Sequence, residues 1–161
     1  MEKSDLMILM ALRDNARQTL TDISKKTAVP ISTIYDRMKS YDSDLVRRYT
    51  CLVDFATIGF NTHAMITLKV KREVREELRS FLNTAPNINC LFKINNGYDF
   101  LFEAVFRHLK ELEDFLERLE EKFPVKEKHV YYIIEDIARE KFMSNPVMHG
   151  LIEPKVASSR P

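Results

Sequence analysis

Hydroxyl, carboxylate and basic side chains crowd into one short segment of the chain, residues 31–39. Hydroxyl groups can donate to or accept from the edges of bases, and an arginine can read guanine or neutralise a phosphate. Two lysines just upstream are suited to contacts with backbone phosphates, and two arginines follow downstream. The candidates for nucleic-acid contact are therefore Lys25, Lys26, Ser32, Thr33, Tyr35, Asp36, Arg37, Lys39, Arg47 and Arg48.

The elements that must position these side chains are short helices, with a tight break between the second and the third. Ile8 and Leu12 recur at helical spacing in the first helix. Ser4 is predicted to cap this helix and Thr21 to cap the second. Pro30 suits the first turn of the third helix, because its missing N–H needs no partner there. This order predicts a helix-turn-helix arrangement with the candidate residues on its third helix.

Three of the basic candidates have a second interpretation. Arg37 can pair with an acidic neighbour and brace the helices instead of meeting nucleic acid. Arg47 and Arg48 begin a short predicted strand, residues 49–53, and adjacent residues on a strand point in opposite directions. Only one of the two is therefore expected to touch a flanking phosphate, and an interdomain salt bridge is the alternative. For the whole segment, the alternative is a small helical domain with solvated charges.

The rest of the chain alternates between strand and helix patterns. In chain order we predict a strand at 64–70, a helix at 74–82, strands at 88–94 and 98–106, a helix at 109–123 and a strand at 130–134. This order is typical of a ferredoxin-like α+β domain, in which two helices cover one face of an antiparallel sheet. The other face would carry apolar side chains that we expect a second copy of the chain to cover, namely Met65, Leu101, Val105, Tyr131 and Ile133.

The sequence thus predicts an α+β protein in several parts. These are a helix-turn-helix domain at 1–48, a linker strand and turn at 49–61, a ferredoxin-like effector and oligomerisation domain at 62–137, and a tail at 138–161. The tail is predicted to be irregular. Its apolar residues could dock on the body of the protein or on a partner, or belong to a partly ordered terminus; they are Phe142, Val147, Met148, Leu151 and Ile152.

A second set of polar candidates lies in the turn between the two central strands, at Asn95, Asn96, Gly97, Tyr98 and Asp99. The Asp99 carboxylate, the amides and exposed backbone N–H groups could bind the ammonium and carboxylate groups of a small ligand. Asn and Gly are also what a tight hairpin requires whatever its function, so plain turn chemistry is the alternative.

Composition excludes several other classes of protein. Only three glycines occur, so no GxGxxG or GxxxxGK[ST] phosphate cradle can be assembled. Cys51 and Cys90 lack CxxC spacing and the four histidines lack HExxH spacing, so we expect no metal and no cofactor. The 25 basic and 24 acidic side chains exclude a uniformly basic coat, and any contact with nucleic acid must come from a local patch. No apolar run approaches a membrane span, and two free thiols are typical of the cytoplasm.

These pieces, in this order and spacing, resemble the Lrp/AsnC family of feast/famine regulators. The resemblance covers residues 4–137 and rests on Asp5-Leu6-Met7-Ile8-Leu9, Asn15-Ala16-Arg17, residues 31–39, Val46-Arg47-Arg48-Tyr49, Ile58-Gly59-Phe60 and Gly97-Tyr98-Asp99-Phe100. It implies a dimer, often assembled into octamers, that bends promoter DNA and responds to amino acids. It also implies that residues 95–99 line the effector pocket, at the junction between dimers.

Two segments depart from the family pattern. Residues 40–44 are one residue shorter than the family's turn after the recognition helix and lack its glycine. The hairpin turn reads Asn96-Gly97-Tyr98-Asp99 where the family has Gly-Asp-Tyr/Phe-Asp, so the glycine is displaced and one carboxylate is missing. We therefore expect a weak amino-acid response, or a different small ligand, with Asp99 as the polar anchor.

Two other functions stay open from the sequence. Sirohaem decarboxylases share the two-part architecture, and Arg47-Arg48-Tyr49 is similar to a stretch in that group. Paired arginines, with His63 or Tyr49 as proton donor, suit a tetrapyrrole that bears several carboxylates. A dimeric interaction module with vestigial DNA contacts is the other alternative. The intact helix-turn-helix pattern favours a regulator without enzymatic activity, whose partners are double-stranded promoter DNA and further copies of itself.

Overall fold

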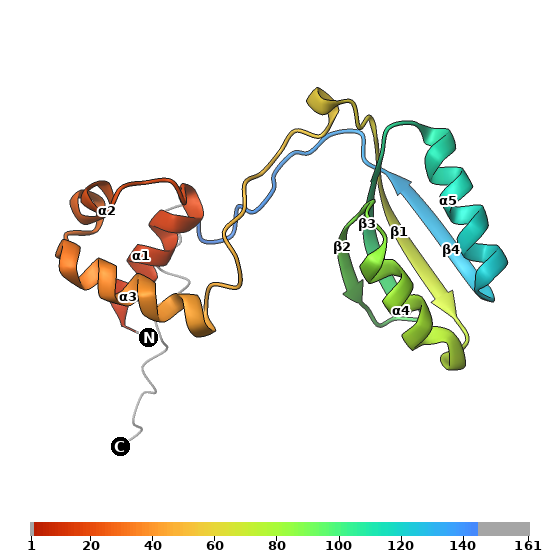
Figure 1. Ribbon diagram of the computed structural model, residues 1–161, viewed down its shortest axis with the longest axis horizontal. Helices are drawn as coiled ribbons and strands as arrows, with labels where there is room; N and C mark the ends of the chain where they lie inside the picture. Colours follow the sequence, from red (N-terminus) through yellow and green to blue (C-terminus); the bar gives the residue numbers. More distant parts are fainter. Residues whose placement is uncertain (1, 145–161) are drawn as a thin grey trace, which may run out of the picture. The chain divides into compact units, whose positions relative to one another are not determined.

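The computed structural model describes residues 2–144, without the side chains of residues 42–44. The chain divides into two compact units, one comprising Met1–Cys51 and the chain from Ile137 onward, the other Leu52–Asp136 (Figure 1). Each unit has a hydrophobic core of its own, and the chain passes between the units twice. In the described part of the chain, no helix is long and apolar enough to cross a membrane.

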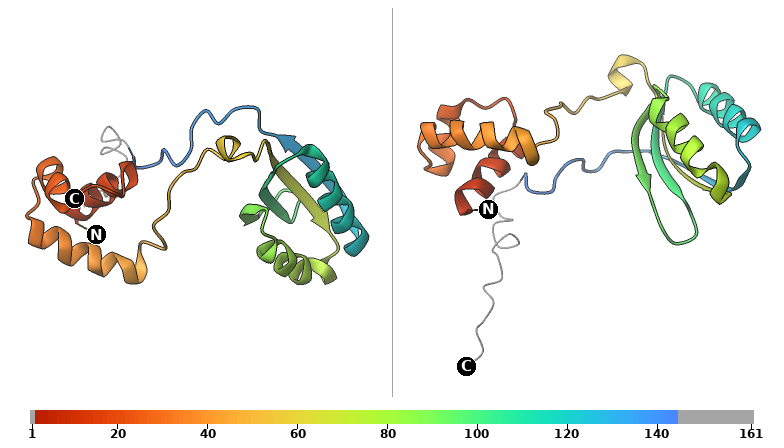
Figure 2. Two further views of the ribbon diagram at one scale, coloured as in Figure 1. Left: turned by 45° about the horizontal axis from the view of Figure 1, so that its top comes forward. Right: turned by 60° about the horizontal axis from the view of Figure 1, so that its bottom comes forward.

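The N-terminal unit is built from α1 (Lys3–Asp14), α2 (Leu20–Thr27) and α3 (Ile31–Asp44). Ile8, Leu12, Ile23 and Ile34 are buried on the facing sides of these helices. Because each helix is apolar on one side, the three close around one small core. The predicted helix-turn-helix arrangement is confirmed (Figures 1 and 2).

The predicted caps of the first two helices are wrong by two residues. Glu2, not Ser4, stands at the N-cap of α1. Thr19, not Thr21, caps α2, where its hydroxyl accepts a hydrogen bond from the backbone N–H of Asp22 at 3.1 Å. A hydroxyl one residue before the first helical turn satisfies an N–H that has no partner inside the helix, which gives Thr19 the better position.

The third helix is longer than predicted. It begins after Pro30, as expected, but continues through residues 40–44, where the sequence indicated a turn. Ile34, Met38 and Tyr41 fall at i, i+4 and i+7, so Tyr41 extends the buried stripe of the helix by one more turn. The segment without the family's glycine is therefore helical up to Asp44.

The linker after α3 lacks the predicted strand. Residues 49–53 have no regular secondary structure, because a strand needs a ladder partner and none of the described strands pairs with them. The predicted turn is present further along. The short 3₁₀ helix η1 (Ala56–Ile58) ends at Gly59, whose φ of +89° is a left-handed conformation that glycine adopts readily.

The C-terminal unit confirms the predicted β-α-β-β-α-β order. Its elements are β1 (Thr62–Val70), η2 (Arg72–Val74), α4 (Arg75–Thr84), β2 (Ile88–Lys93), β3 (Phe100–Phe106), α5 (Leu109–Lys122) and β4 (Val125–Tyr132). The strands form one antiparallel sheet in the order β2-β3-β1-β4. Both helices pack on one face, where Ile66, Leu68 and Phe102 meet Leu78 and Leu116 in the core. Figure 2 shows this layering from two sides.

The last strand starts five residues earlier than predicted. It pairs with β1 from Val125 to Tyr132, with an irregularity in the register between Lys69 and Val70. Its first half, Val125-Lys126-Glu127-Lys128, carries three charged residues in a row, which hide the period-two pattern of a strand.

The sheet face away from the helices carries polar side chains beside the predicted apolar ones. The strand register places Met65 between Glu103 and Tyr131, and Thr67 between Leu101 and His129. Apolar and polar side chains thus alternate in rows across this open face, which we define as the outward residues of the four strands. Met65, Leu101, Val105 and Tyr131 lie on this face, as predicted, and His63, Glu103 and His129 share it with them.

The predicted tail begins inside the N-terminal unit. Residues 137–144 are irregular, as predicted, but they belong with the helices, where Arg13 of α1 donates to the backbone carbonyl of Glu140 at 3.0 Å. Phe142 is 63% exposed. Val147, Met148, Leu151 and Ile152 lie outside the described residues.

Candidate nucleic-acid interface

The exposed side chains of α3 form one stripe along the helix. Ser32, Tyr35, Asp36 and Lys39 are all exposed, and Tyr35 keeps 58% of its surface accessible. Their spacing of i, i+3, i+4 and i+7 puts them on one side of the helix, opposite the fully buried Ile34. We call these four residues the α3 stripe. It offers hydroxyls, a carboxylate and an ammonium group on a helix, the element that fits the major groove of DNA.

Two of the predicted α3 candidates lie off this stripe. Thr33 is half-buried at its edge. Arg37 turns toward α1, where one guanidinium nitrogen lies 2.6 Å from Glu2 and another 3.4 Å from Asp5. This position favours the second interpretation of Arg37, in which it pairs with acidic neighbours and braces the helices.

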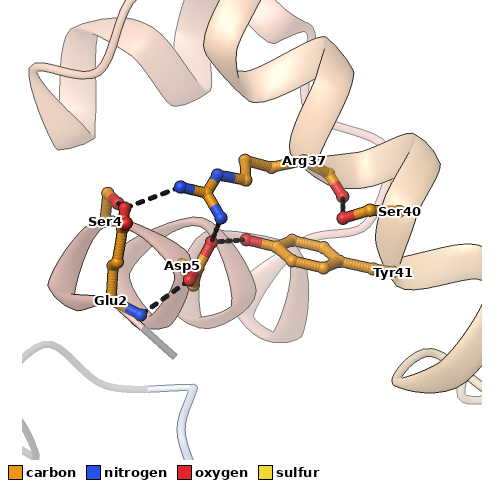
Figure 3. A network of polar contacts seen from close by, with 6 residues as sticks. All are labelled: Glu2, Ser4, Asp5, Arg37, Ser40 and Tyr41. Carbon is orange, nitrogen blue, oxygen red and sulfur yellow. Dashed lines mark hydrogen bonds and ion pairs between the residues drawn. The ribbon is translucent and has the colours of Figure 1, made fainter.

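A buried carboxylate is at the centre of this brace (Figure 3). Asp5 accepts the hydroxyl of Tyr41 at 2.7 Å and the backbone N–H of Glu2 at 2.7 Å, in addition to the contact with Arg37. Because Asp5 and Glu2 belong to the start of α1 while Tyr41 and Arg37 belong to α3, the network fixes one helix against the other. The α3 stripe is thereby held at a set angle to the rest of the unit.

The network also shifts the acidity of its members. Burial alone would raise the pKa of Asp5. Hydrogen bonds from Tyr41 and from the Glu2 amide, with the charge of Arg37, outweigh burial and hold the Asp5 pKa below its ordinary value. Burial and the hydrogen bond to Asp5 raise the pKa of the Tyr41 phenol well above its ordinary value. At neutral pH the pair is therefore a carboxylate that accepts and a phenol that donates.

The lysines predicted for phosphate contact are exposed on α2. Lys26 lies 3.4 Å from the Asp14 carboxylate, and both side chains are more than half exposed, so this ion pair is readily exchanged for another. A shallow hollow of about 390 Å³ lies beside the two lysines and is also lined by Gln18 and Asp22. Lys25 and Lys26 are thus presented together at one surface of the unit.

Arg47 and Arg48 are both exposed, in the segment that follows Leu45 at the end of α3. Since this segment is not a strand in the described chain, the alternation that would have pointed them in opposite directions does not apply. Both arginines thus lie in an exposed, irregular segment that directly follows the third helix.

The loop between β2 and β3 has the predicted turn chemistry. Asn96 and Gly97 adopt positive φ values of 64° and 91°, which Asn and Gly tolerate best, and the N–H of Ile94 donates to the carbonyl of Asp99 at 3.1 Å. Asn95, Asn96 and Gly97 are exposed.

The last two loop residues instead attach the loop to the domain. The Tyr98 hydroxyl lies 2.7 Å from Nε2 of His129. The Asp99 carboxylate accepts the backbone N–H of Val70 at 2.9 Å and pairs with Arg75 at 2.7 Å, with its side chain 11% exposed. Both carboxylate oxygens thus already have partners that tie the end of β1 to the start of α4.

A buried group on the open face was not predicted. Glu103 is 4% exposed, yet one carboxylate oxygen lies 2.6 Å from Nε2 of His63 and the other accepts the side-chain N–H of Asn89 at 2.6 Å. The signal was readable, because Glu103 interrupts an otherwise apolar strand at an outward position. His63, considered above as a proton donor, has this carboxylate as a neighbour, while Arg47, Arg48 and Tyr49 belong to the other unit.

Models of two protein families match the chain. The Lrp/AsnC ligand binding domain matches residues 63–141, and a winged helix-turn-helix DNA-binding domain matches residues 1–42. The chain is also 30% identical over 114 residues to the HTH-type transcriptional regulator FL11 of Pyrococcus furiosus, which covers 70% of this chain and 76% of the relative.

Solved structures share the fold over most of the chain. A transcriptional regulator from Neisseria meningitidis, in complex with L-methionine, matches with a TM-score of 0.81 at 22% identity and covers 92% of this chain and 98% of its own. LrpC of Bacillus subtilis matches with a TM-score of 0.76 at 21% identity, over 86% and 97% of the two chains. The matched domains, their order and the identity to a named regulator agree, and the chain belongs to the Lrp/AsnC family of DNA-binding transcriptional regulators.

Proposed function

We propose that this regulator reads the sequence of its operator with the α3 stripe. The observation that carries the proposal is the separation of roles on α3. Ser32, Tyr35, Asp36 and Lys39 face outward together, while Arg37 and Tyr41 fix the helix to α1. A helix that presents polar side chains to the major groove needs such fixation, because a loss of orientation weakens every base contact at once.

The basic residues around the stripe complete the interface. Lys25 and Lys26 on α2 neutralise phosphates beside the groove, and Arg47 or Arg48 meets the flanking phosphate backbone. Thr33, at the edge of the stripe, adds a hydroxyl. Phosphate contacts set the position of the protein on the duplex and base contacts set its preference, so the two groups of residues have different signatures.

Selection of bound sequences from a random DNA library, followed by titration on the selected site, separates these signatures. Tyr35→Ala should change the selected sequence and weaken binding by about 5- to 150-fold, which corresponds to roughly 1–3 kcal/mol per lost base contact. Lys25→Ala should weaken binding to all sequences and lower the salt slope by about one. Lys110→Ala, an exposed lysine on α5, is the matched control and should do neither. An unchanged site and affinity for Tyr35→Ala would place the reading surface elsewhere.

We infer that the active form is a homodimer or a larger assembly of dimers. Residues 49–53 have a strand pattern but no ladder partner among the described residues, and Leu52 is 61% exposed there. The open face of the sheet likewise leaves Phe92 and Tyr131 about half exposed. A second copy would supply both the missing strand partner and the missing cover. In sedimentation of the full chain, Tyr131→Asp should shift the protein toward monomer, whereas Leu109→Asp on α5 should not.

The effector is proposed to meet the exposed amides of Asn95 and Asn96 and the backbone of Gly97. Tyr98 and Asp99 then support the loop, because the Asp99 carboxylate already holds Arg75 and the Val70 N–H. A thermal-shift screen with the proteinogenic amino acids tests this. A ligand whose stabilising effect survives Asn96→Ala would place the effector site away from this loop.

We propose no catalytic role and place the protein in the cytoplasm, in keeping with its free cysteines, Cys51 and Cys90. The decarboxylase alternative is tested directly by mixing the purified protein with sirohaem. Uptake of the pigment with loss of carbon dioxide would overturn the assignment.

A further inference from the structure

One arginine holds the returning C-terminal segment on the DNA-binding unit. Nε of Arg13 donates to the carbonyl of Phe142 at 3.2 Å, and a terminal nitrogen donates to the carbonyl of Glu140 at 3.0 Å. The other terminal nitrogen lies 2.8 Å from the Glu140 carboxylate. A single exposed ion pair contributes little, but three contacts to one planar guanidinium fix both the position and the direction of the segment.

The backbone of this segment is shaped to make these contacts. Glu140 and Met143 have φ values of 50° and 62°, a left-handed conformation that is uncommon for residues other than glycine. The hydroxyl and the N–H of Ser144 both donate to the carbonyl of Lys141, at 2.9 and 3.2 Å, and close a turn. A strained backbone persists where its surroundings determine it, and here the surroundings include Arg13 of α1.

Ser144, at the end of this turn, also lines an apolar groove in the same unit. The groove has a volume of about 380 Å³ and lies between α1 and α2. Met7, Met10, Ala11 and Asp14 of α1 line it together with Lys26 and Thr27 of α2. Methionine side chains adapt to irregular partners, so a wall of this kind suits an apolar peptide segment.

We propose that the apolar segment that directly follows Ser144 docks into this groove of its own chain. Residues 145–161 follow Ser144, and Pro146, Val147 and Met148 are the first side chains that could enter. Four extended residues span at most about 14 Å, so Met148 can reach along the groove from a point that already lines it. A segment tethered at the rim also has a high effective concentration there, which favours it over a free peptide or a second copy.

The docked segment would act as a strap on the DNA-binding unit. The C-terminal unit ends at Asp136, so the chain that continues from Ile137 is a second covalent connection between the two units besides the linker. Arg13 and the groove would fasten this connection to α1 and α2, the helices that support the α3 stripe.

Hydrogen exchange of the full-length protein tests the docking. Val147→Asp combined with Met148→Asp should speed exchange of the α1 and α2 amides by about tenfold, because a lost apolar contact of roughly 1.4 kcal/mol corresponds to that factor. A chain that ends at Ser144 should show the same change. Val156→Asp, further along the tail, is the matched control and should exchange like the wild type. Unchanged protection in the double variant and in the shortened chain would overturn the proposal.

The groove side is tested with Met7→Ser in both backgrounds. In the full chain this substitution should reduce protection, and in the chain that ends at Ser144 it should add less than half of that effect, because the partner is already gone. Equal effects in both backgrounds would mean that Met7 contributes only to the core, and would also count against docking. Val156→Asp introduces the same charge into the tail, so an effect confined to the double variant separates docking from a general effect of added charge.

A photocrosslinking benzophenone residue at position 147 identifies which chain occupies the groove. In a mixture of isotopically heavy and light protein, own-chain docking should join position 147 to the Met7–Met10 peptide with heavy–heavy and light–light products alone. Heavy–light products in proportion to mixing would show that a second copy provides the segment, and would overturn the own-chain assignment.

Discussion

Asp5 in the N-terminal unit and Glu103 in the C-terminal unit are both buried carboxylates, each 4% exposed, yet their surroundings differ. Asp5 lies between two helices, and its partners Tyr41 and Arg37 come from the helix that covers it. Glu103 lies on the sheet face that α4 and α5 leave open, and its partners come from neighbouring strands of the same layer. The first carboxylate therefore joins two helices of one unit, while the second lies on the face that the proposed second copy would cover.

The largest effect is expected from Asp5→Ala. This change leaves the Tyr41 hydroxyl without its acceptor and Arg37 without one of its two carboxylates. We expect the N-terminal unit to lose about 3 kcal/mol of stability, the upper range for a charged buried hydrogen-bond partner. Urea unfolding followed by circular dichroism measures this. Asp36→Ala, on the exposed side of α3, should change stability by less than about 0.5 kcal/mol.

Asp5→Ala should leave the assembly intact, because Asp5 joins two helices within one unit. The variant should be less stable to unfolding but assemble normally once folded, and dissociation would show that Asp5 also serves an interface. Sedimentation of the variant at a temperature where it is folded provides that check.

The sequence predicted the elements more reliably than the contacts between them. Strong period-two and period-3.6 patterns placed β1 and α5 within about two residues, because burial on one face dictates those patterns. The Tyr41–Asp5 pair was missed, because residues 36 positions apart carry no local signal of contact. Tyr41 was assigned to a turn because residues 40–44 match the family's turn after the recognition helix, although its spacing from Ile34 continued the buried stripe of the helix.

The shared face of the site residues could be predicted from the sequence, but their contacts within the fold could not. Ser32, Tyr35, Asp36 and Lys39 share a helical face, which spacing alone determines once the helix is known. The ligand-anchoring role of Asp99 stays a prediction, and the sequence did not indicate that its carboxylate also holds Val70 and Arg75. A turn aspartate next to a positive-φ glycine looks the same in sequence whether it faces solvent or the end of a neighbouring strand.

A smaller effect, on assembly instead of folding, is expected from Glu103→Gln. The amide keeps a hydrogen bond to Asn89 but removes the charge beside His63 in the middle of the open face. If a second copy covers this face, the dimer dissociation constant should rise about tenfold, equivalent to roughly 1.4 kcal/mol. A concentration series in sedimentation equilibrium measures the constant. Glu120→Gln on α5 is the control. An equal rise of the dissociation constant in that variant would show that Glu103 has no specific role in an interface.

The effect expected from Asp99→Asn is smaller than those of Asp5→Ala and Glu103→Gln. Asn keeps an oxygen that can accept the Val70 N–H but loses the ion pair with the partly exposed Arg75, so the C-terminal unit should lose about 1 kcal/mol. Thermal unfolding without ligand gives the value. A loss as large as that of Asp5→Ala would make Asp99 a third buried structural carboxylate and weaken the contrast drawn between the first two.

The smallest effect concerns the pH dependence of the Asp5 network. Because the folded-state pKa of Asp5 lies below the ordinary value of 3.8, the unfolded state binds the proton more readily. The ionised Asp5 therefore contributes its full stability above the unfolded pKa and loses it as pH falls through the lower, folded-state pKa. Tyr41→Phe removes the hydrogen bond that does most to lower this pKa, so the effect of burial on the pKa is opposed less. In this variant the stability contributed by ionised Asp5 therefore begins to be lost at a higher pH.

The difference in unfolding free energy between wild type and Tyr41→Phe should then be constant from pH 7 to about pH 5 and narrow below about pH 4. Urea unfolding of both proteins across this range measures it. A difference that stays constant down to pH 3 would mean that the Tyr41 hydroxyl does not favour the charged carboxylate, and that Asp5 depends on Arg37 and the Glu2 amide instead.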